Sequence, residues 1–323
     1  MDVLVGDAKL RPGAAGAVTI GNFDGVHLGH QALLEDLSAR AAAGALVPAV
    51  VTFDPHPASV LHPETAPPLL APLAFRLELL ERAGVGAVLV VRFDKARAEE
   101  RAEDFVDEVL VRQLRARLVL VGADFRFGHR RLGDVALLRT LGRQSGFEVG
   151  GVPLVDRRGP VSSTRVRRLL AGGGVEEAAE LLGRPHEVRG TVVHGDGRGR
   201  LLGFPTANID VQADYLVPGD GVYAGELALA RGAGLRTVVS VGRRPTFYDS
   251  PSASLAVEAH VLDFAGDLYG QSTSLRFVAK LRDQETFVGE GELVAQMRRD
   301  AGRAADVLAA GVLAEPERRR GSC

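Results

Sequence analysis

Three observations predict an α/β domain with a parallel sheet, followed by a small antiparallel β-barrel with a C-terminal helix. The chain has 323 residues, more than one hydrophobic core usually supports, so two domains are expected. Strand-like and helix-like segments alternate between residues 17 and 183. After the glycine run 172–174 and a short helix, the segments become strand-like and are separated by turns. We therefore expect domains at 1–183 and 184–310 and a disordered tail at 311–323.

The apolar pattern predicts each element of the N-terminal domain. Apolar runs bounded by turn residues predict strands at 17–20, 48–53, 88–93 and 118–121. Helical spacing of apolar residues predicts helices at 31–37, 74–83 and 102–114. The strands are apolar on both faces, which is typical of a parallel sheet covered by helices on both sides. Because ligands bind at the carboxyl ends of such strands, we expect one composite site formed by the loops 21–30, 54–57 and 122–128.

The C-terminal part shows shorter apolar runs between turns. These runs predict strands at 188–193, 221–229, 235–241, 255–262 and 274–280. Helical spacing predicts one helix before them, at 175–182, and one after them, at about 289–309. A small antiparallel barrel with a terminal helix accounts for this order.

Composition excludes several functional classes. A hydrophobic fraction of 46% and a charged fraction of 25% are those of an ordinary globular protein. The net charge of −2 gives no overall attraction to nucleic acid or to an anionic membrane, so neither is expected as a partner. The single cysteine, Cys323, cannot form an intramolecular disulfide, and no signal peptide or bilayer-spanning run is found, so we expect a cytoplasmic protein. An oligomer is compatible with the sequence but not required by it.

The segment from Gly21 to His30 is the most informative part of the chain. It reads as the end of a strand, a glycine-rich turn and the start of a helix, with His27 and His30 at the helix start. A helix N-terminus offers free N–H groups and a positive dipole end, both of which favour phosphate. Two surface histidines beside an ordinary turn are the alternative, but this spacing favours a phosphate site. Neither a lysine-bearing phosphate loop nor a Gly-x-Gly-x-x-Gly fingerprint is present.

Two further segments bear groups suited to phosphate or metal. The hydroxyl cluster 162–164 precedes a helix and, taken alone, can equally be a helix cap. The segment 194–208 contains four glycines before Thr206 and Asn208, whose oxygens are hard ligands suited to Mg²⁺. A hairpin turn whose Thr and Asn satisfy local backbone groups is the alternative. Glu258 alternates with apolar residues, so taken alone it can be merely the outward residue of a strand.

Taken together, these motifs resemble the bacterial bifunctional riboflavin kinase/FAD synthetase (FMN adenylyltransferase) family, from about Val18 to Leu308. The resemblance implies a Rossmann-like, nucleotidyltransferase-type N-terminal domain and a riboflavin kinase barrel. It implies phosphorylation of riboflavin to FMN with ATP, and then AMP transfer from ATP to FMN, which gives FAD and pyrophosphate. FMN and FAD would be substrate and product, and Mg²⁺ would accompany ATP. Arg243 and Arg244 stand where many members carry a smaller polar pair, which can alter the kinase site.

The resemblance also implies roles for individual residues. The catalytic residues would be His27 and His30, which bind ATP phosphates, and Glu258, the base for the flavin 5′-hydroxyl. Nucleotide binding is expected at Gly21, Asn22, Phe23, Asp24, Gly29, Ser162, Ser163, Thr164, Arg167, Gly195, Gly197 and Gly199. Flavin binding is expected at His56, Asp124, Phe125, Arg126, Phe127, Phe204, Arg298 and Asp300, the last two having a solvated helix face as their alternative. Thr206 and Asn208 would hold the metal.

Two other functions are compatible with parts of this pattern. One is a nucleotidyltransferase with a single activity, whose barrel only binds flavin. The other is a flavin-binding regulator without catalysis. The kinase-type motif around Glu258 argues against the first, and the completeness of both motif sets argues against the second.

Overall fold

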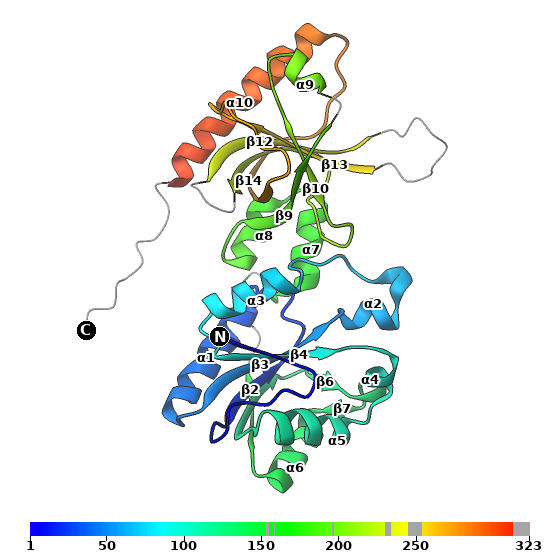
Figure 1. Cartoon of the computed structure of the whole chain (residues 1–323), viewed down its shortest axis with the longest axis vertical. Helices are drawn as coiled ribbons and strands as arrows, with labels where there is room; N and C mark the ends of the chain where they lie inside the picture. The colour runs from blue at the N-terminus through cyan, green and yellow to red at the C-terminus, as the bar shows by residue number, and fades with distance from the viewer. Residues whose placement is uncertain (153–154, 158, 196, 230–233, 245–253, 313–323) are drawn as a thin grey trace, which may run out of the picture. The chain divides into compact units, whose positions relative to one another are not determined.

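The computed structural model describes the chain except for residues 153–154, 158, 196, 230–233, 245–253 and 313–323 (Figure 1). The chain divides into two compact units, Met1–Ser163 and Thr164–Cys323. Most of the tail that we expected to be disordered lies outside the described residues. Each unit is described below by itself.

Unit 1 is built on a six-stranded sheet in which all strands are parallel, as the sequence predicts. Its order is β1-β4-β3-β2-β5-β8. The strands are β1 (Asp2–Val5), β2 (Gly16–Ile20), β3 (Val47–Asp54), β4 (Ala87–Arg92), β5 (Leu118–Gly122) and β8 (Glu148–Val152). The central strand β2 is buried along its whole length, because both faces of the sheet are covered. β1 and β8 were not predicted.

The helices of unit 1 connect these strands. They are α1 (Leu28–Ala43), α2 (Pro57–Leu61), α3 (Leu73–Arg82), α4 (Lys95–Glu99), α5 (Ala102–Phe105) and α6 (Val135–Ser145), with short 3₁₀ turns η1 (Pro63–Thr65) and η3 (His129–Arg131). The helix predicted at 102–114 consists of α5 and a π-helical continuation, η2 (Val106–Gln113). A small hairpin of β6 (Arg126–Phe127) and β7 (Gly133–Asp134) follows β5. The carboxyl ends of β2, β3 and β5 therefore lie side by side, each followed by a loop.

Unit 2 contains a closed antiparallel barrel of order β10-β13-β12-β11-β14-β9, as expected for the C-terminal part (Figure 1). Its strands are β9 (His186–Val193), β10 (Ala207–Val211), β11 (Gly221–Leu229), β12 (Leu235–Arg244), β13 (Ser254–Val261) and β14 (Ser272–Arg282). α9 (Arg198–Leu201) lies between β9 and β10, and α10 (Glu290–Val312) packs against β11, β12 and β14. β10 was not predicted, because it begins inside the Pro-Thr-Ala-Asn segment.

Two helices precede the barrel, α7 (Ser163–Ala171) and α8 (Val175–Leu182). α8 packs against β9 and β14, and Glu176 on this helix accepts a hydrogen bond from the backbone N–H of Lys280 at 2.9 Å. The Leu170 carbonyl accepts from the Gly219 N–H at 2.9 Å. These contacts explain why the compact units divide at Ser163 and Thr164, before the domain boundary expected at residue 183.

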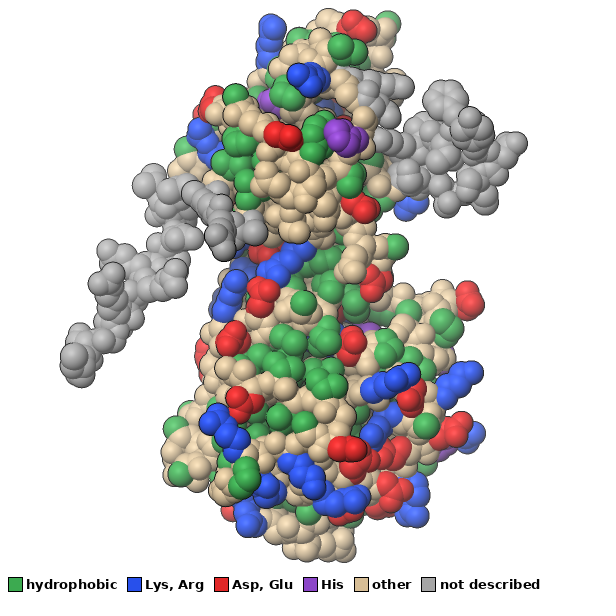
Figure 2. Space-filling view, in the orientation of Figure 1, with side chains coloured by type: hydrophobic (Ala, Val, Ile, Leu, Met, Phe, Trp, Pro, Cys, Tyr) green, Lys and Arg blue, Asp and Glu red, His purple; other side chains and the backbone are tan. Residues whose placement is uncertain are grey.

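Basic and acidic side chains lie interspersed on the face of the molecule shown in Figure 2. Among the residues that the structure describes, none of the helices has the length and apolar character needed to cross a bilayer.

Candidate active sites

The loop between β2 and α1 places two histidines at the N-terminus of α1. His27 is the N-cap residue, and its Nδ1 accepts a hydrogen bond from the backbone N–H of His30 at 3.3 Å. The two rings stack with centroids 3.8 Å apart and an interplanar angle of 14°. Because Nδ1 of a neutral His27 accepts, its proton is on Nε2, which makes that nitrogen a donor. The helix start predicted from the sequence is confirmed, with both imidazoles on it.

The His30 ring is held in its neutral form. Its Nδ1 is buried and has no hydrogen-bond partner among the described residues. Burial, and secondly the nearby His27, hold the pKa of His30 well below its usual value, because both disfavour a positive charge on its ring. At neutral pH this imidazole can donate a hydrogen bond without carrying a charge of its own.

Glycine and phenylalanine residues support this histidine pair. A Cβ on Gly29 would lie 3.2 Å from the His27 ring, so the close approach of the ring favours glycine there. Phe23 is buried and its ring centroid lies 4.8 Å from that of His30. Phe23 and Val26 have positive φ angles of 49° and 40°, conformations that cost energy and cluster at functional loops. Phe23 thus packs against the His30 ring.

Asp24 anchors the same loop from inside. Its buried carboxylate accepts hydrogen bonds from the backbone N–H groups of Leu70 at 3.0 Å and Ala71 at 2.8 Å. Its backbone carbonyl accepts from the hydroxyl of Ser163 at 2.9 Å, at the start of α7. Asp24 therefore shapes the loop, and its expected contact with nucleotide stays a prediction.

His56 and Asn22 join the second loop to the first. His56 is the N-cap of α2, and its Nδ1 accepts from the Ala58 N–H at 3.1 Å. Its Nε2, which then carries the proton of the neutral ring, lies 3.2 Å from the side-chain amide of Asn22. A half-turn of that amide presents its oxygen to His56 and leaves its N–H groups as donors. His56, expected to bind flavin, is thus a partner of Asn22.

The three loops at the carboxyl ends of β2, β3 and β5 line one cavity of about 790 Å³, which we call the loop cavity. The first loop contributes Gly21 and Asn22, the second contributes Pro57 beside the strand residue Phe53, and the third contributes residues 124–127. The three loops therefore meet around one cavity, as expected from the sequence, and its role as a binding site stays a prediction. His27, His30 and His56 are not part of its lining.

Aromatic rings follow one another along the wall of the loop cavity. Phe125 and Phe127 stack with centroids 5.4 Å apart, and Phe105 lies 6.2 Å from Phe127. Phe53 lies 6.4 Å from Phe105 and 5.7 Å from Phe93. Only Phe125 and Phe127 were predicted as site residues. Phe53 and Phe93 each end a predicted strand, and that position was the signal by which they could have been found.

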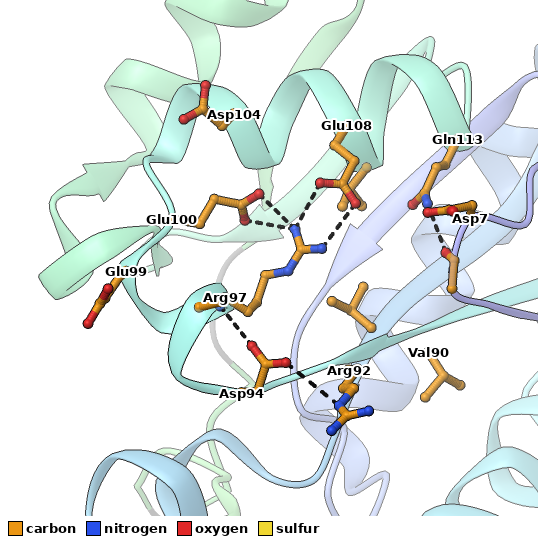
Figure 3. Close-up of a pocket in the computed structure, with 14 residues that line it drawn as sticks. Asp7, Val90, Arg92, Asp94, Arg97, Glu99, Glu100, Asp104, Glu108 and Gln113 are labelled. Atoms are coloured by element: carbon orange, nitrogen blue, oxygen red, sulfur yellow. Dashed lines mark hydrogen bonds and ion pairs between the residues drawn. The ribbon is translucent and has the colours of Figure 1, made fainter.

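A second cavity of about 610 Å³, the acidic cavity, shares Arg97, Glu99 and Glu100 with the loop cavity (Figure 3). The Arg97 guanidinium donates to Glu100 at 2.8 Å and to Glu108 at 3.0 Å, and Asp94 caps α4 by accepting from the Arg97 N–H at 3.0 Å. These bonds fix α4, which forms part of the wall of the loop cavity. Among the described residues no cluster of histidines, cysteines or carboxylates suited to a metal ion is found.

In unit 2 the glycine-rich segment lies directly against the residues expected to hold a metal. A Cβ on Gly195 would lie 2.1 Å from the side-chain nitrogen of Asn208, and one on Gly199 would lie 3.3 Å from Oγ1 of Thr206. The backbone at Gly195 and Gly199 thus packs so closely against its neighbours that only glycine fits; we call this segment the glycine cradle. Gly197 has a φ of 70° and no neighbour that a Cβ would meet. Thr206 precedes β10, and Asn208 lies on it.

Glu258 lies on β13 between buried Val257 and Ala259, as the alternation predicts. It pairs with Asn208 of β10 on one side and with Ser240 of β12 on the other, so it faces the expected metal residue across the ladder. It lines a cavity of about 360 Å³, the barrel cavity, with Asp220, Ser240, Gly242, Arg243, Ala256 and Gln284. Sequence reasoning missed Asp220, Ser240 and Gln284, which no local motif marks.

His260 and Phe204 support the turn before β10. Nδ1 of His260 lies 2.8 Å from the carbonyl oxygen of Pro205, and its ring makes an edge contact with Phe204 at 5.2 Å between centroids. His260 therefore holds the segment that carries Thr206.

The remaining predicted residues lie on helices. Asp300 on α10 is buried, and its carboxylate accepts from Arg282 at 2.9 Å and from Gln296 at 2.8 Å, so it joins α10 to β14. Arg298 on the same helix is exposed. The flavin contacts expected of both stay predictions. Thr164 and Arg167 lie in the first turns of α7, and Ser162 directly precedes this helix.

Comparisons with known proteins bear on both sites. Family models described as FAD synthetase and riboflavin kinase match residues 12–165 and 182–308. A bifunctional riboflavin kinase/FMN adenylyltransferase of Escherichia coli is 40% identical over 284 residues, covering 88% of this chain and 90% of that protein. One of Pseudomonas fluorescens is 40% identical over 322 residues, covering 99% and 100%. The chain belongs to this bifunctional family.

The division of the family matches the two sites. The FAD synthetase match contains the histidine pair and the loops around the loop cavity, and the riboflavin kinase match contains the glycine cradle and Glu258. A crystal structure of a Streptococcus pneumoniae protein described as a macrolide-efflux protein has the same fold: it is 30% identical, with a TM-score of 0.85 over 94% of this chain and 99% of that one.

Proposed function

We propose that the two reactions of this riboflavin kinase/FMN adenylyltransferase take place at two separate sites, one in each unit. Riboflavin would be phosphorylated to FMN at the barrel cavity, and AMP would be transferred from ATP to FMN at the histidine pair and the loop cavity. The observation that supports this assignment is that the groups suited to phosphate fall into two sets: His27 and His30 at the start of α1, and the glycine cradle beside Glu258 in the barrel.

For adenylyl transfer, an FMN phosphate oxygen forms a bond to the α-phosphorus of ATP while the bond from that phosphorus to the pyrophosphate oxygen breaks. The FMN phosphate is already an anion, so no residue needs to remove a proton. The enzyme's task is to align the two phosphates and stabilise the developing charge. Nε2–H of His27, the neutral His30 ring and the N–H groups at the start of α1 supply donors for that charge.

The aromatic wall of the loop cavity suits a flat, largely apolar ring. Phe125 and Phe127 offer stacked faces, and Asp124 and Arg126 add polar groups at its edge. We assign the flavin ring of FMN to this wall. Asn22, whose amide N–H groups are free to donate once its oxygen accepts from His56, lies on the same cavity and would bind between ring and phosphate.

For riboflavin phosphorylation, the flavin 5′-hydroxyl oxygen forms a bond to the γ-phosphorus of ATP and ADP leaves. An alcohol must lose its proton in this step, so a base is needed. Glu258 lines the barrel cavity, and we assign the proton to its carboxylate.

Thr206 and Asn208 are the residues that would hold Mg²⁺ in this site. The glycine cradle suits a triphosphate beside them, because a backbone without side chains lets N–H groups approach phosphate oxygens, and hydroxyl and amide oxygens are ligands that Mg²⁺ accepts. The ion would neutralise the charge of the phosphates.

The broader proposals rest on simpler features. A cytoplasmic location is supported by the single cysteine, and a lack of nucleic-acid partners by the net charge of −2. The domain limits 1–183 and 184–310 also stay proposals, since residues 166–181 lie between the two family matches.

Two variants of the full chain test the division of labour. His30→Ala should lower the rate of FAD formation from FMN and ATP and leave FMN formation from riboflavin intact, and Glu258→Gln should do the reverse. Each variant is the folding control for the other. If each variant lost both activities equally, the two-site assignment would be wrong. If the unchanged chain made FAD from FMN but no FMN from riboflavin, the barrel would be a binding module only.

A further inference from the structure

Arg76 is a fully buried arginine that no motif of either site includes. It lies in the first turn of α3, on the face that also buries Phe75 and Leu79, and only 1% of its surface is exposed. Arginine is rarely buried to this extent unless its charge is paired or its hydrogen-bonding groups are used. The hydrogen bonds of the Arg76 guanidinium therefore indicate its role in the fold.

A single nitrogen of Arg76 bridges two loops of the loop cavity. Nη1 donates to the backbone carbonyl of Asn22 at 2.9 Å, to Oγ1 of Thr52 at 2.9 Å and to the carbonyl of Phe53 at 3.1 Å. The Thr52 hydroxyl donates in turn to the Asn22 carbonyl at 3.1 Å. Asn22 and Phe53 both line the cavity. The guanidinium therefore ties the backbone after β2 to the end of β3, directly behind the lining residues.

The bonding pattern is not that of an ion pair that stabilises the core. Within the described part of the chain, the hydrogen bonds of Arg76 go to neutral oxygens, and its buried Nε has no partner. Burial lowers the pKa of Arg76, and the carboxylates of Asp24 and Asp54 act in the opposite direction from a distance. A buried charge without a directly bonded carboxylate stabilises a fold poorly compared with an apolar side chain of similar size.

Two carbonyl groups that converge on one buried point need a donor there, because an unsatisfied buried carbonyl is costly. Arg76 supplies that donor together with a positive charge behind the loop that leads to His27. A shift of either carbonyl would move Asn22 or Phe53 relative to the other. Catalysis that depends on alignment is sensitive to such shifts, since a displacement of about 1 Å can lower a rate roughly 100-fold.

We propose that Arg76 is a positioning residue for adenylyl transfer: it sets the spacing between the loop that carries the histidine pair and the end of β3, and so the alignment of FMN with ATP. The proposal rests on the assignment of this reaction to the loop cavity. It gives Arg76 no contact with substrate. Its loss therefore acts on kcat more than on the KM for either substrate, and leaves riboflavin phosphorylation in unit 2 unchanged.

The test uses Arg76→Met and Arg76→Lys in the full chain, with both reactions measured. Arg76→Met should lower the kcat of FAD formation by about 10- to 100-fold, with riboflavin phosphorylation within about twofold. Arg76→Lys, which keeps a charge and N–H donors, should restore most of the loss. The matched control is Gln113→Met: Gln113 is also buried and donates to a backbone carbonyl, that of Gly6 at 2.9 Å, but it does not line the loop cavity. It should lower stability without lowering kcat.

Three outcomes would overturn the proposal: an unchanged kcat in Arg76→Met, an equal loss in Gln113→Met at matched stability, or no recovery in Arg76→Lys. If hydrogen exchange shows that Arg76→Met fails to fold unit 1, Thr52→Val decides, because it removes one bridging hydroxyl and keeps the volume. It should lower kcat by about fivefold, and no effect would count against the proposal. The assignment of adenylyl transfer to the loop cavity has its own test: it would be wrong if a His30→Ala variant still made FAD at the rate of the unchanged chain.

Discussion

Replacing Arg97 with methionine should weaken the wall between the loop cavity and the acidic cavity. The Arg97 guanidinium is the group to which both Glu100 and Glu108 bond, and it lies between them in Figure 3. Methionine keeps most of the length of the side chain and removes its charge and donors. The change therefore tests the network and leaves packing largely intact.

The expected loss follows from the burial and geometry of the cluster. The side chains of Arg97, Glu100 and Glu108 are 21%, 16% and 34% exposed, so they are shielded from water more than a surface pair. A hydrogen bond to a charged group in such surroundings contributes about 1.5 kcal/mol, and Arg97 bonds to two carboxylates. Without it, Glu100 and Glu108 remain near each other and lose the cation to which both bond. We expect the free energy of unfolding of unit 1 to fall by about 3 kcal/mol at neutral pH.

The loss should shrink in acid. The hydrogen bond from Arg97 holds the pKa of Glu108 below its usual value, so its contribution is present above the unfolded pKa and lost as pH falls through the folded pKa. Burial raises the pKa of Glu100 although Arg97 opposes this, and removal of Arg97 raises it further. The difference between the variant and the unchanged chain should therefore shrink as the pH falls through the folded pKa of Glu108, which lies below its usual value, and become small once both carboxyls are protonated.

The assay must report on unit 1. All four tyrosines, at residues 215, 223, 248 and 269, lie in unit 2 and the chain has no tryptophan, so intrinsic fluorescence follows the barrel only. Amide hydrogen exchange of peptides from α4 and η2 in urea gives the free energy of unit 1. Arg101→Met is the control, because Arg101 and Glu103 are 73% and 43% exposed and lie 3.5 Å apart. It should cost less than about 0.5 kcal/mol.

The reasoning would be refuted if Arg97→Met and Arg101→Met lowered stability equally, or if the loss in Arg97→Met grew as the pH fell. A wall held by Arg97 also predicts a higher KM for FMN in that variant, with riboflavin phosphorylation unchanged.

Two further predictions concern the histidine pair and the glycine cradle. Folding lowers the pKa of His30, so below about pH 6.5 the unfolded chain takes up a proton that the folded chain does not. The free energy of unfolding of unit 1 should therefore fall with acidification, by up to about 1.4 kcal/mol per pH unit. Urea unfolding of a His30→Asn variant should lose this dependence, and an unchanged slope would show that other groups cause it. Gly195→Ala places a Cβ 2.1 Å from the Asn208 side chain. It should raise the concentration of ATP or Mg²⁺ needed for riboflavin phosphorylation at least tenfold, roughly the effect of a misplaced metal ligand. The control Gly234→Ala, whose Cβ would have no neighbour closer than 3.8 Å, should leave this concentration unchanged. Equal kinetics in the two glycine variants would argue against the cradle.

Periodic apolar patterns predicted most of the fold. The helix at 175–182 and the strand at 221–229 have the predicted limits, because a buried stripe or run with turn residues at both ends leaves little freedom. The missed strands lack such patterns. β1 alternates between half-buried and exposed residues at the sheet edge, and β8 contains two glycines that favour no regular structure.

The site could be predicted only as far as its groups are neighbours in sequence. The histidine pair depends on a local strand, turn and helix start, and the structure has it there. Other bonds join segments that are distant in sequence, and no spacing in the sequence marks them. Asp24 bonds to the backbone at residues 70–71, and Arg76 bonds to residues 22 and 53. The contact between His56 and Asn22 was likewise invisible, since the two residues come from different loops.

The central claim is that this chain has two independent sites for ATP. Calorimetric titration of the full chain with a non-hydrolysable ATP analogue, in Mg²⁺ and saturating flavin, measures their number directly. Two molecules of nucleotide per chain are expected, with His30→Ala weakening one binding event and Gly195→Ala the other. One molecule per chain at saturation would contradict the claim.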